Sequence, residues 1–126
     1  MRILLVGLGG FAGSILRYWL SGFAQRIAPS NGFPWGTLVV NLTGCLMMGV
    51  LLGLIQDRRL FGPYAYPLLG VGLLGGFTTF SAFSNETVTA FRGGLTGIAV
   101  TNILASVVFG LIAIVAGRAI VNLLWK

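Results

Sequence analysis

Hydrophobic residues fill four long stretches of the chain, and charged residues fall between them. Charged side chains are missing from residues 3–16, 27–56, 60–85 and 93–117, and the first stretch continues past Arg17 to Phe23. A helix that crosses a bilayer needs about 20 predominantly apolar residues. The pattern therefore predicts an all-α integral membrane protein with four transmembrane helices, near residues 3–24, 36–55, 65–91 and 95–120.

Three short segments rich in Gly, Pro or polar residues separate the predicted helices. They are APSNGFPWG (Ala28–Gly36), QDRRLFGP (Gln56–Pro63) and FRGG (Phe91–Gly94), and proline and Asn-Gly favour loops. Four crossings put both termini on one side of the membrane. That side carries Arg2, Arg58, Arg59, Arg118 and Lys126, and the other carries Arg26, Arg92 and, near them, Arg17. This bias is mild, so insertion in either orientation stays open.

Composition agrees with a single membrane domain over residues 1–126. Hydrophobic residues make up 56% of the chain and charged residues 8%, whereas soluble domains carry about 25% charged residues. The net charge is +6, but the basic residues flank apolar stretches, which is typical of membrane anchoring and not of nucleic-acid binding. The chain has no His and one Cys, so we expect neither an internal disulfide nor an enzyme. The first stretch lacks a signal-peptidase-like site and is expected to be a retained helix.

Two pairs of glycines have the spacing of helix contacts. Gly9 and Gly13 form one GxxxG pair, and Gly49 and Gly53 form the other. Small residues at this spacing let helix backbones approach closely in membranes. Four short helices barely enclose a pathway, so we expect a homo-oligomer if a polar solute crosses.

Polar residues inside the predicted spans are candidate functional residues, because they are costly in a bilayer. Asn41 and Thr37 lie one turn apart in the second span, and Asn102 and Ser106 share a face of the fourth. The third span holds a polar group formed by Thr78, Thr79, Ser81, Ser84 and, near its end, Glu86. Hydrogen-bond donors outnumber carboxylates in this set, which favours an anion over a cation as the solute.

The segment GGFTTFSAF, Gly75–Phe83, predicts a break in the third helix near Gly75–Thr79. Irregular backbone at bilayer depth must be buried in protein or line a cavity. Beyond the break, Phe80 and Phe83 share a helix face. From spacing alone, packing or lipid contact is the favoured interpretation of the two rings. Contact between the positive ring edges and a small anion is the alternative.

Three motifs together resemble the Fluc (CrcB) family of small fluoride channels over essentially the whole chain. They are GGFAGSILRY (Gly9–Tyr18), GTLVVNLTG (Gly36–Gly44) and GGFTTFSAF. The resemblance implies an antiparallel, dual-topology homodimer in a bacterial inner membrane, with lipid around it and two fluoride pathways. Its implied activity is passive, fluoride-selective export that protects the cell from fluoride toxicity.

The resemblance also implies roles for particular residues. The fluoride pathway would include Asn41, Phe80, Phe83, Ser81, Thr37, Asn102, Ser106 and Glu86. The carbonyls of Gly75 and Thr78 would hold a structural Na⁺ at the dimer centre, and Arg17, Gly76 and Thr79 would be structural. Ala82 departs from the family pattern, which usually has Thr at this position.

Two other classes of function remain open from the residues. A small multidrug-type, proton-coupled antiporter is also a four-span dimer, but it needs a carboxylate in its first helix, where this chain has only Arg17. A non-transporting accessory subunit needs only the glycine-rich packing faces. That class leaves Asn41 and the polar break unexplained.

Overall fold

The computed structural model describes residues 1–125, which form helices joined by short loops. The elements are α1 (Arg2–Ile27), α2 (Trp35–Leu52), the π-helical η1 (Gly53–Asp57) and η2 (Tyr66–Leu74), α3 (Gly75–Phe77), α4 (Phe80–Arg92) and α5 (Thr96–Leu124). They combine into four helices long and apolar enough to cross a membrane: Arg2–Ile27, Trp35–Asp57, Tyr66–Arg92 and Thr96–Leu124. The prediction of four candidate spans is confirmed.

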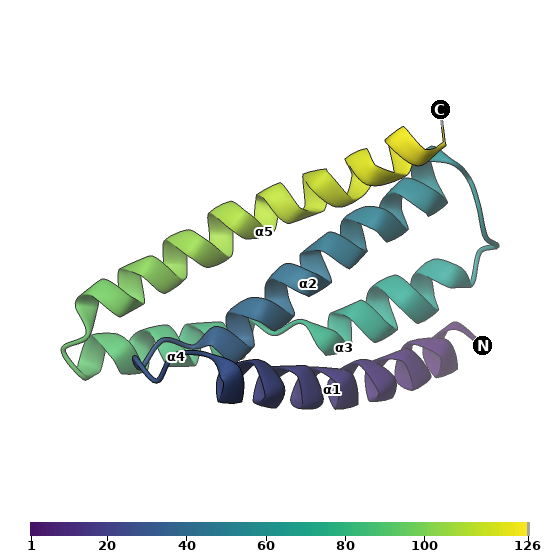
Figure 1. Ribbon diagram of the computed structural model, residues 1–126. Helices are drawn as coiled ribbons and strands as arrows, with labels where there is room; N and C mark the ends of the chain where they lie inside the picture. Colours follow the sequence, from purple (N-terminus) through teal and green to yellow (C-terminus); the bar gives the residue numbers. More distant parts are fainter. Residues whose placement is uncertain (126) are drawn as a thin grey trace.

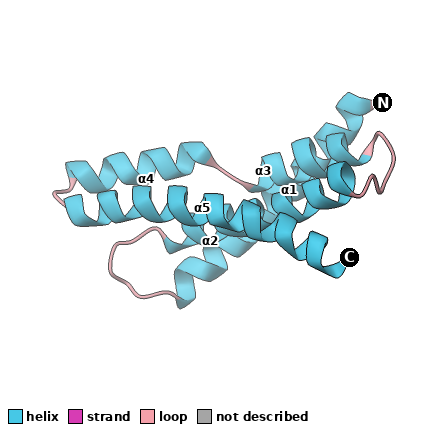
Figure 2. Ribbon diagram, turned by 90° about the horizontal axis from the view of Figure 1, so that it is seen from above, coloured by secondary structure: helices cyan, strands magenta, loops and turns pink. Residues whose placement is uncertain are grey.

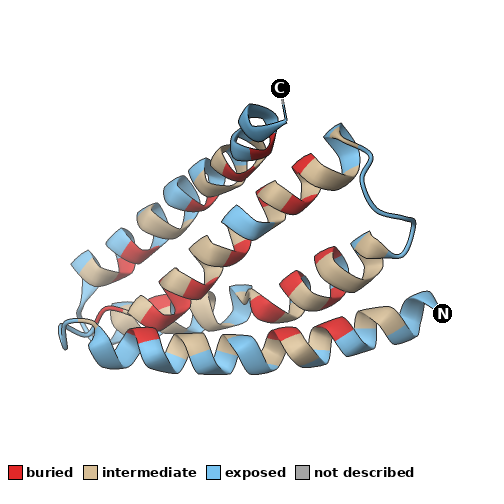
Figure 3. Ribbon diagram, turned by 45° about the vertical axis from the view of Figure 1, so that its right-hand side comes forward, coloured by how far each residue is buried: buried red, intermediate tan, exposed pale blue. Residues whose placement is uncertain are grey.

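The helices run back and forth, so that their ends gather at two poles. Both chain ends and the loop between η1 and η2 lie at one pole, and the two other loops lie at the opposite pole (Figure 1). Along the molecule, α2 packs on α5, α1 packs on η2 and α3, and α4 packs on α5. Buried residues follow the facing sides of these helices, while the outer side of α1 is exposed (Figure 3).

The last helix is longer than the sequence predicted. It continues through Arg118 to Leu124, where an end near residue 120 was expected. The guanidinium of Arg118 donates from Nη2 to Oδ1 of Asp57 at 2.5 Å and from Nε to Oδ2 at 3.2 Å. Asp57 thus pairs with the Arg118 charge at the exposed end of the bundle, and the helix continues past Arg118 to Leu124.

Glycines bring the helix backbones into direct contact, as their spacing predicted. A Cβ on Gly9 would overlap the carbonyl oxygen of Leu68, and one on Gly13 would lie 2.9 Å from the amide nitrogen of Phe77. These contacts join α1 to η2 and α3. On the other side of the bundle, a Cβ on Gly49 would lie 3.1 Å from Cα of Gly117 in α5. Both GxxxG pairs therefore mark helix contacts, since Gly53 also packs closely on Val121.

The third span is broken where the sequence predicted, but not by its glycines. Gly75 is helical, with φ −65° and ψ −36°, and Gly75–Phe77 form the short α3. The chain leaves the helix at Thr78 (φ −82°, ψ 156°) and Thr79 (φ −148°, ψ 113°), which form the link between α3 and α4 (Figure 2). Gly76 serves packing, because a Cβ there would lie 2.7 Å from the carbonyl oxygen of Gly10.

Two π-helical segments were not predicted. They flank the loop between the second and third spans, and in η1 the Arg58 amide donates to the carbonyl of Gly53, five residues back, at 3.1 Å. In η2, an almost wholly apolar run carries no periodicity that separates an α-helix from a wider π turn.

Candidate functional site

The helix break is held open by the side-chain amide of Asn41 in α2. Its Nδ2 donates to the carbonyl oxygen of Thr79 at 3.1 Å, and its Oδ1 accepts from the Thr79 amide at 2.8 Å. One side chain thus satisfies both backbone groups of an extended residue, as a neighbouring β-strand would. An amide nitrogen has two N–H groups, so Asn41 keeps one further donor.

The same bonds change the hydrogen bonding of the carbonyls that precede the break. In a continuous helix the Thr79 amide would donate to the carbonyl of Gly75, four residues back. Here that amide donates to Asn41, and the amide and hydroxyl of Thr78 both donate to Leu74, each at 3.0 Å. The carbonyl of Gly75 therefore lacks its usual helical donor.

Helix α4 begins with a side-chain cap. Oγ1 of Thr79 accepts from the amide of Ala82 at 3.2 Å, which is the N-cap bond that threonine commonly provides. The hydroxyls of Thr79 and Ser81 also lie 3.2 Å apart. Ala82 takes part through its backbone, so its missing hydroxyl leaves the cap intact.

The two phenylalanines of the first turn of α4 form a pair. The ring centroids of Phe80 and Phe83 are 5.5 Å apart and their planes meet at 48°. Such tilted pairs are a favoured aromatic arrangement. Phe80 is 79% exposed in the single chain, and Phe83 is half-buried. The pair therefore stands at the surface of the chain, beside the break.

Thr37 and Glu86, which are far apart in sequence, meet where α2 and α4 approach. The hydroxyl of Thr37 donates to Oε1 of Glu86 at 2.6 Å. Oε2 of Glu86 is buried and has no hydrogen-bond partner among residues 1–125. The sequence placed both residues in the candidate pathway but gave no sign that they pair.

A second polar group joins α4 to α5. Nδ2 of Asn102 donates to Oγ1 of Thr87 at 2.9 Å, and the hydroxyl of Ser106 donates to Oδ1 of Asn102 at 3.4 Å. Thr87 in turn donates to the carbonyl of Phe83 at 2.7 Å. Sequence reasoning missed the part that Thr87 plays, although its spacing of seven residues from Phe80 places it on the same line of the helix.

The remaining predicted residues lie outside these groups. Arg17 is on α1, which contacts α2, η2 and α3, whereas the polar contacts above join α2, α4 and α5. Gly76 belongs to the contact between α1 and α3 described above. The structure therefore brings Asn41 of α2 to Thr79 and Ser81 at the start of α4, and Thr37 of α2 to Glu86 of α4. Asn102 and Ser106 of α5 belong to the separate contact with Thr87.

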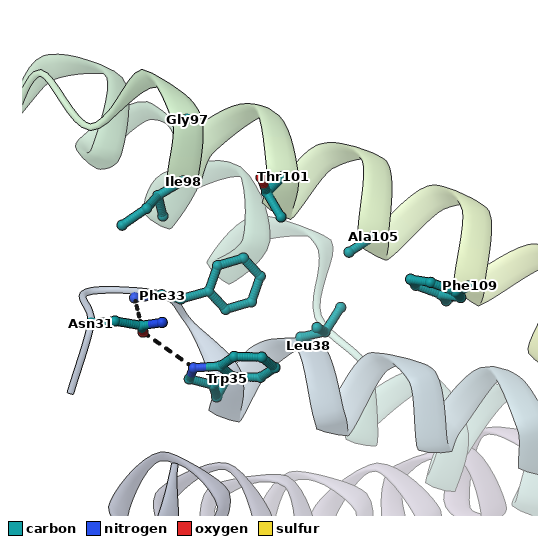
Figure 4. A pocket seen from close by; sticks show the side chains of 9 residues that line it. All are labelled: Asn31, Phe33, Trp35, Leu38, Gly97, Ile98, Thr101, Ala105 and Phe109. Carbon is teal, nitrogen blue, oxygen red and sulfur yellow. Dashed lines mark hydrogen bonds between the residues drawn. The ribbon is translucent and has the colours of Figure 1, made fainter. Parts of the chain in front are cut away.

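A separate groove of about 440 Å³ lies between the first loop, α2 and α5 (Figure 4). Oδ1 of Asn31 shapes it by accepting from the amide of Phe33 at 3.1 Å and from Nε1 of Trp35 at 3.3 Å. Its walls are mostly apolar and include Phe33, Trp35, Leu38, Ile98 and Phe109. The groove shares no lining residue with the polar groups, so we treat it as apart from them.

Comparison with known proteins identifies the family. Residues 4–118 match the family described as CrcB-like protein, Camphor Resistance (CrcB). The chain is 43% identical over 122 residues to a fluoride-specific ion channel FluC of Methylobacillus flagellatus, covering 97% of this chain and 95% of that protein. It is 46% identical over 117 residues to the FluC protein of Paracoccus denitrificans, covering 93% and 91%. For the FluC protein of Agrobacterium fabrum the identity is 44% over 120 residues, covering 95% of each. The chain therefore belongs to the CrcB-like family, and it is similar to these fluoride-specific ion channels over nearly their whole length.

Proposed function

We propose that this protein is a fluoride-selective channel that lets F⁻ leave the cell passively and so protects it from fluoride toxicity. The observation that carries the proposal is the cluster of neutral donors beside the aromatic pair. It consists of the second N–H of Asn41, the hydroxyl of Ser81 and the ring edges of Phe80 and Phe83. The names and the extent of the similar FluC proteins support the same function.

The physical requirement for such a pathway is to replace water around a small, strongly hydrated anion. Amide and hydroxyl donors supply short hydrogen bonds, and aromatic edges supply weak positive potential. Conduction also requires binding weak enough for release. Neutral donors meet this requirement better than a guanidinium does.

Not every polar group at the site is free to meet an anion. The hydroxyl of Thr37 donates to Glu86, so it must leave that carboxylate before it can donate to F⁻. The first N–H of Asn41 is likewise held by the Thr79 carbonyl. We infer that Asn41, Ser81 and the two rings make the first contacts, with Thr37, Ser106 and Glu86 farther along.

The proposed active form is an antiparallel homodimer. Phe80 is 79% exposed in the single chain, and it follows directly after the extended backbone of Thr78 and Thr79. Irregular backbone at bilayer depth needs protein or a cavity around it. A second copy of this chain, packed over the break, would shield the irregular backbone from lipid. It would also enclose the aromatic pair between the two copies.

The break also suits a bound Na⁺ at the dimer centre. The Gly75 carbonyl has lost its helical donor to Asn41, and Thr78 is extended, so its carbonyl is turned out of the helical path. Neutral carbonyl oxygens are ligands that alkali cations accept. Bound there, Na⁺ would supply positive charge that holds carbonyls of both copies together.

The decisive test of this pathway is fluoride efflux from proteoliposomes, measured with a fluoride electrode. Phe80→Ile combined with Phe83→Ile is expected to abolish efflux and to leave a folded dimer. Phe109→Ile, a matched change in the separate apolar groove, is expected to retain it. Unchanged efflux in the double variant would reject the aromatic pair as part of the pathway. Proton-driven export of a cationic dye would instead favour the antiporter.

A further inference from the structure

Helix α4 carries the aromatic pair but has little apolar anchoring within the chain. Its one buried residue is the polar Thr87, which is 7% exposed. The break at Thr78 and Thr79 separates it from α3, so helix continuity does not fix its rotation. Apolar burial adds little between helices in lipid, where packing and hydrogen bonds hold them together. The position of α4 therefore depends on a few polar contacts.

Asn102 in α5 faces that buried residue. It is 1% exposed, among the most completely buried side chains in residues 1–125. A buried amide is costly unless it is hydrogen-bonded. Its nitrogen donates to Thr87 at 2.9 Å, and its oxygen accepts from Ser106 at 3.4 Å. Ser106 lies one turn away on α5 itself and orients the amide, whereas the bond to Thr87 forms only when α4 holds a suitable rotation and height against α5.

The polar contacts continue to the backbone of the aromatic pair. Because the Thr87 oxygen accepts from Asn102, its own proton is directed to the carbonyl of Phe83 at 2.7 Å. The donors therefore point in one direction, from Ser106 through Asn102 and Thr87 to Phe83. A shift at Asn102 is passed to the residue that bears the second ring.

We propose that Asn102 and Thr87 form a positioning lock that sets the rotation of α4 and thereby the direction of the Phe80 and Phe83 rings. Asn102 acts through Thr87 and does not contact the anion. This differs from a lining role, which requires a side chain that an open pathway reaches. The effect on flux rests on the proposed channel function, whereas the lock itself does not.

A double-mutant cycle on fluoride efflux tests whether Asn102 acts through Thr87. Asn102→Leu and Thr87→Val are each expected to reduce efflux by about three- to tenfold, because the free energy of one interhelical hydrogen bond in a membrane corresponds to a change of this size. The double variant is expected to fall no further than either single variant. Thr87→Ser keeps the hydroxyl and should retain efflux, and Thr89→Val on the exposed side of α4 is the matched control. Reductions that multiply in the double variant would show an independent role for Asn102 and overturn the proposal.

Hydrogen exchange of residues 80–92 provides a readout that does not depend on transport. Loss of the lock should speed backbone exchange in α4 equally in both single variants and in the double variant, and leave Thr89→Val unchanged. Unchanged exchange in Asn102→Leu would reject the lock. If the unaltered protein carries no fluoride, the channel proposal fails and exchange alone decides the lock. If Asn102→Leu does not fold, exchange in Thr87→Val compared with Thr87→Ser carries the same test.

Discussion

The two halves of the third span are held in different ways. Before the break, η2 and α3 lie against α1 with backbone on backbone, through Gly9, Gly13 and Gly76. After the break, α4 is held by side-chain hydrogen bonds to α2 and α5, through Asn41, Thr37 and Asn102. One half is fixed by shape and the other by polar contacts that reach into the candidate site.

The difference indicates a division of labour within one span. Close backbone contacts tolerate no added atom, so the first half serves as a rigid scaffold. Polar contacts are directional, and each has a defined partner. Changes in the scaffold should therefore reduce folding, whereas changes in α4 should reduce transport more than stability.

The largest effect is expected from adding methyl groups to the scaffold. In Gly9→Ala with Gly13→Ala, each new Cβ would meet the backbone of η2 or α3, and overpacking costs about 1–3 kcal/mol per site. We expect a marked loss of monodisperse protein by size-exclusion chromatography. Gly7→Ala on the same helix, where nothing lies within 4 Å, is the matched control. Equal yields from both proteins would contradict the scaffold role.

Removing the amide at the break should stop transport at a moderate cost in stability. Asn41→Leu leaves the Thr79 amide and carbonyl without partners and removes the remaining donor. We expect no measurable fluoride efflux and a lower free energy of unfolding, by about 1–3 kcal/mol. Measuring thermal unfolding in detergent together with efflux separates the loss of stability from the loss of transport. Normal efflux in Asn41→Leu would show that neither the amide donor nor the shape of the break matters.

Loss of the helix cap should have a smaller effect. Thr79→Val removes the oxygen that accepts from the Ala82 amide and is expected to cost about 1 kcal/mol. Thr79→Ser retains that oxygen and should cost little. Thermal unfolding of the two variants compares them directly. A Ser variant as unstable as the Val variant would point to the methyl group, not the cap.

The smallest effect is expected at the end of the bundle. Asp57→Asn breaks the exposed pair with Arg118, and exposed pairs contribute little to stability. We expect efflux and the unfolding temperature to stay close to those of the unaltered protein. A large loss of either would show that this pole is coupled to the site.

The sequence predicted the spans and the break well, because both depend on local composition. Apolar runs between charges defined four helices, and the polar segment from Gly75 to Phe83 located the interruption within a few residues. The predicted break spanned Gly75–Thr79, and within it Thr78 and Thr79 are the residues that leave the helix, while Gly75 stays helical. Thr and Ser carry no local sign of an extended conformation in an apolar span.

The partners of the polar residues were beyond reach of the sequence. Asn41 and Thr79 are 38 residues apart, and Thr37 and Glu86 are 49 apart. Such pairs depend on how helices rotate against one another, which a single chain's periodicity does not specify. The burial of Asn102 against Thr87 is of the same kind. Pathway roles for the named residues, the antiparallel dimer and the Na⁺ site stay predictions.

Selective, passive conduction of fluoride can be measured by comparing the efflux of two anions. Proteoliposomes loaded with fluoride or with chloride are diluted into solution lacking that anion, without a pH gradient, and efflux is recorded with the matching electrode. We expect rapid fluoride efflux that needs no proton gradient, and chloride efflux no faster than from protein-free liposomes. Equal efflux of both anions, or none of fluoride, would contradict it.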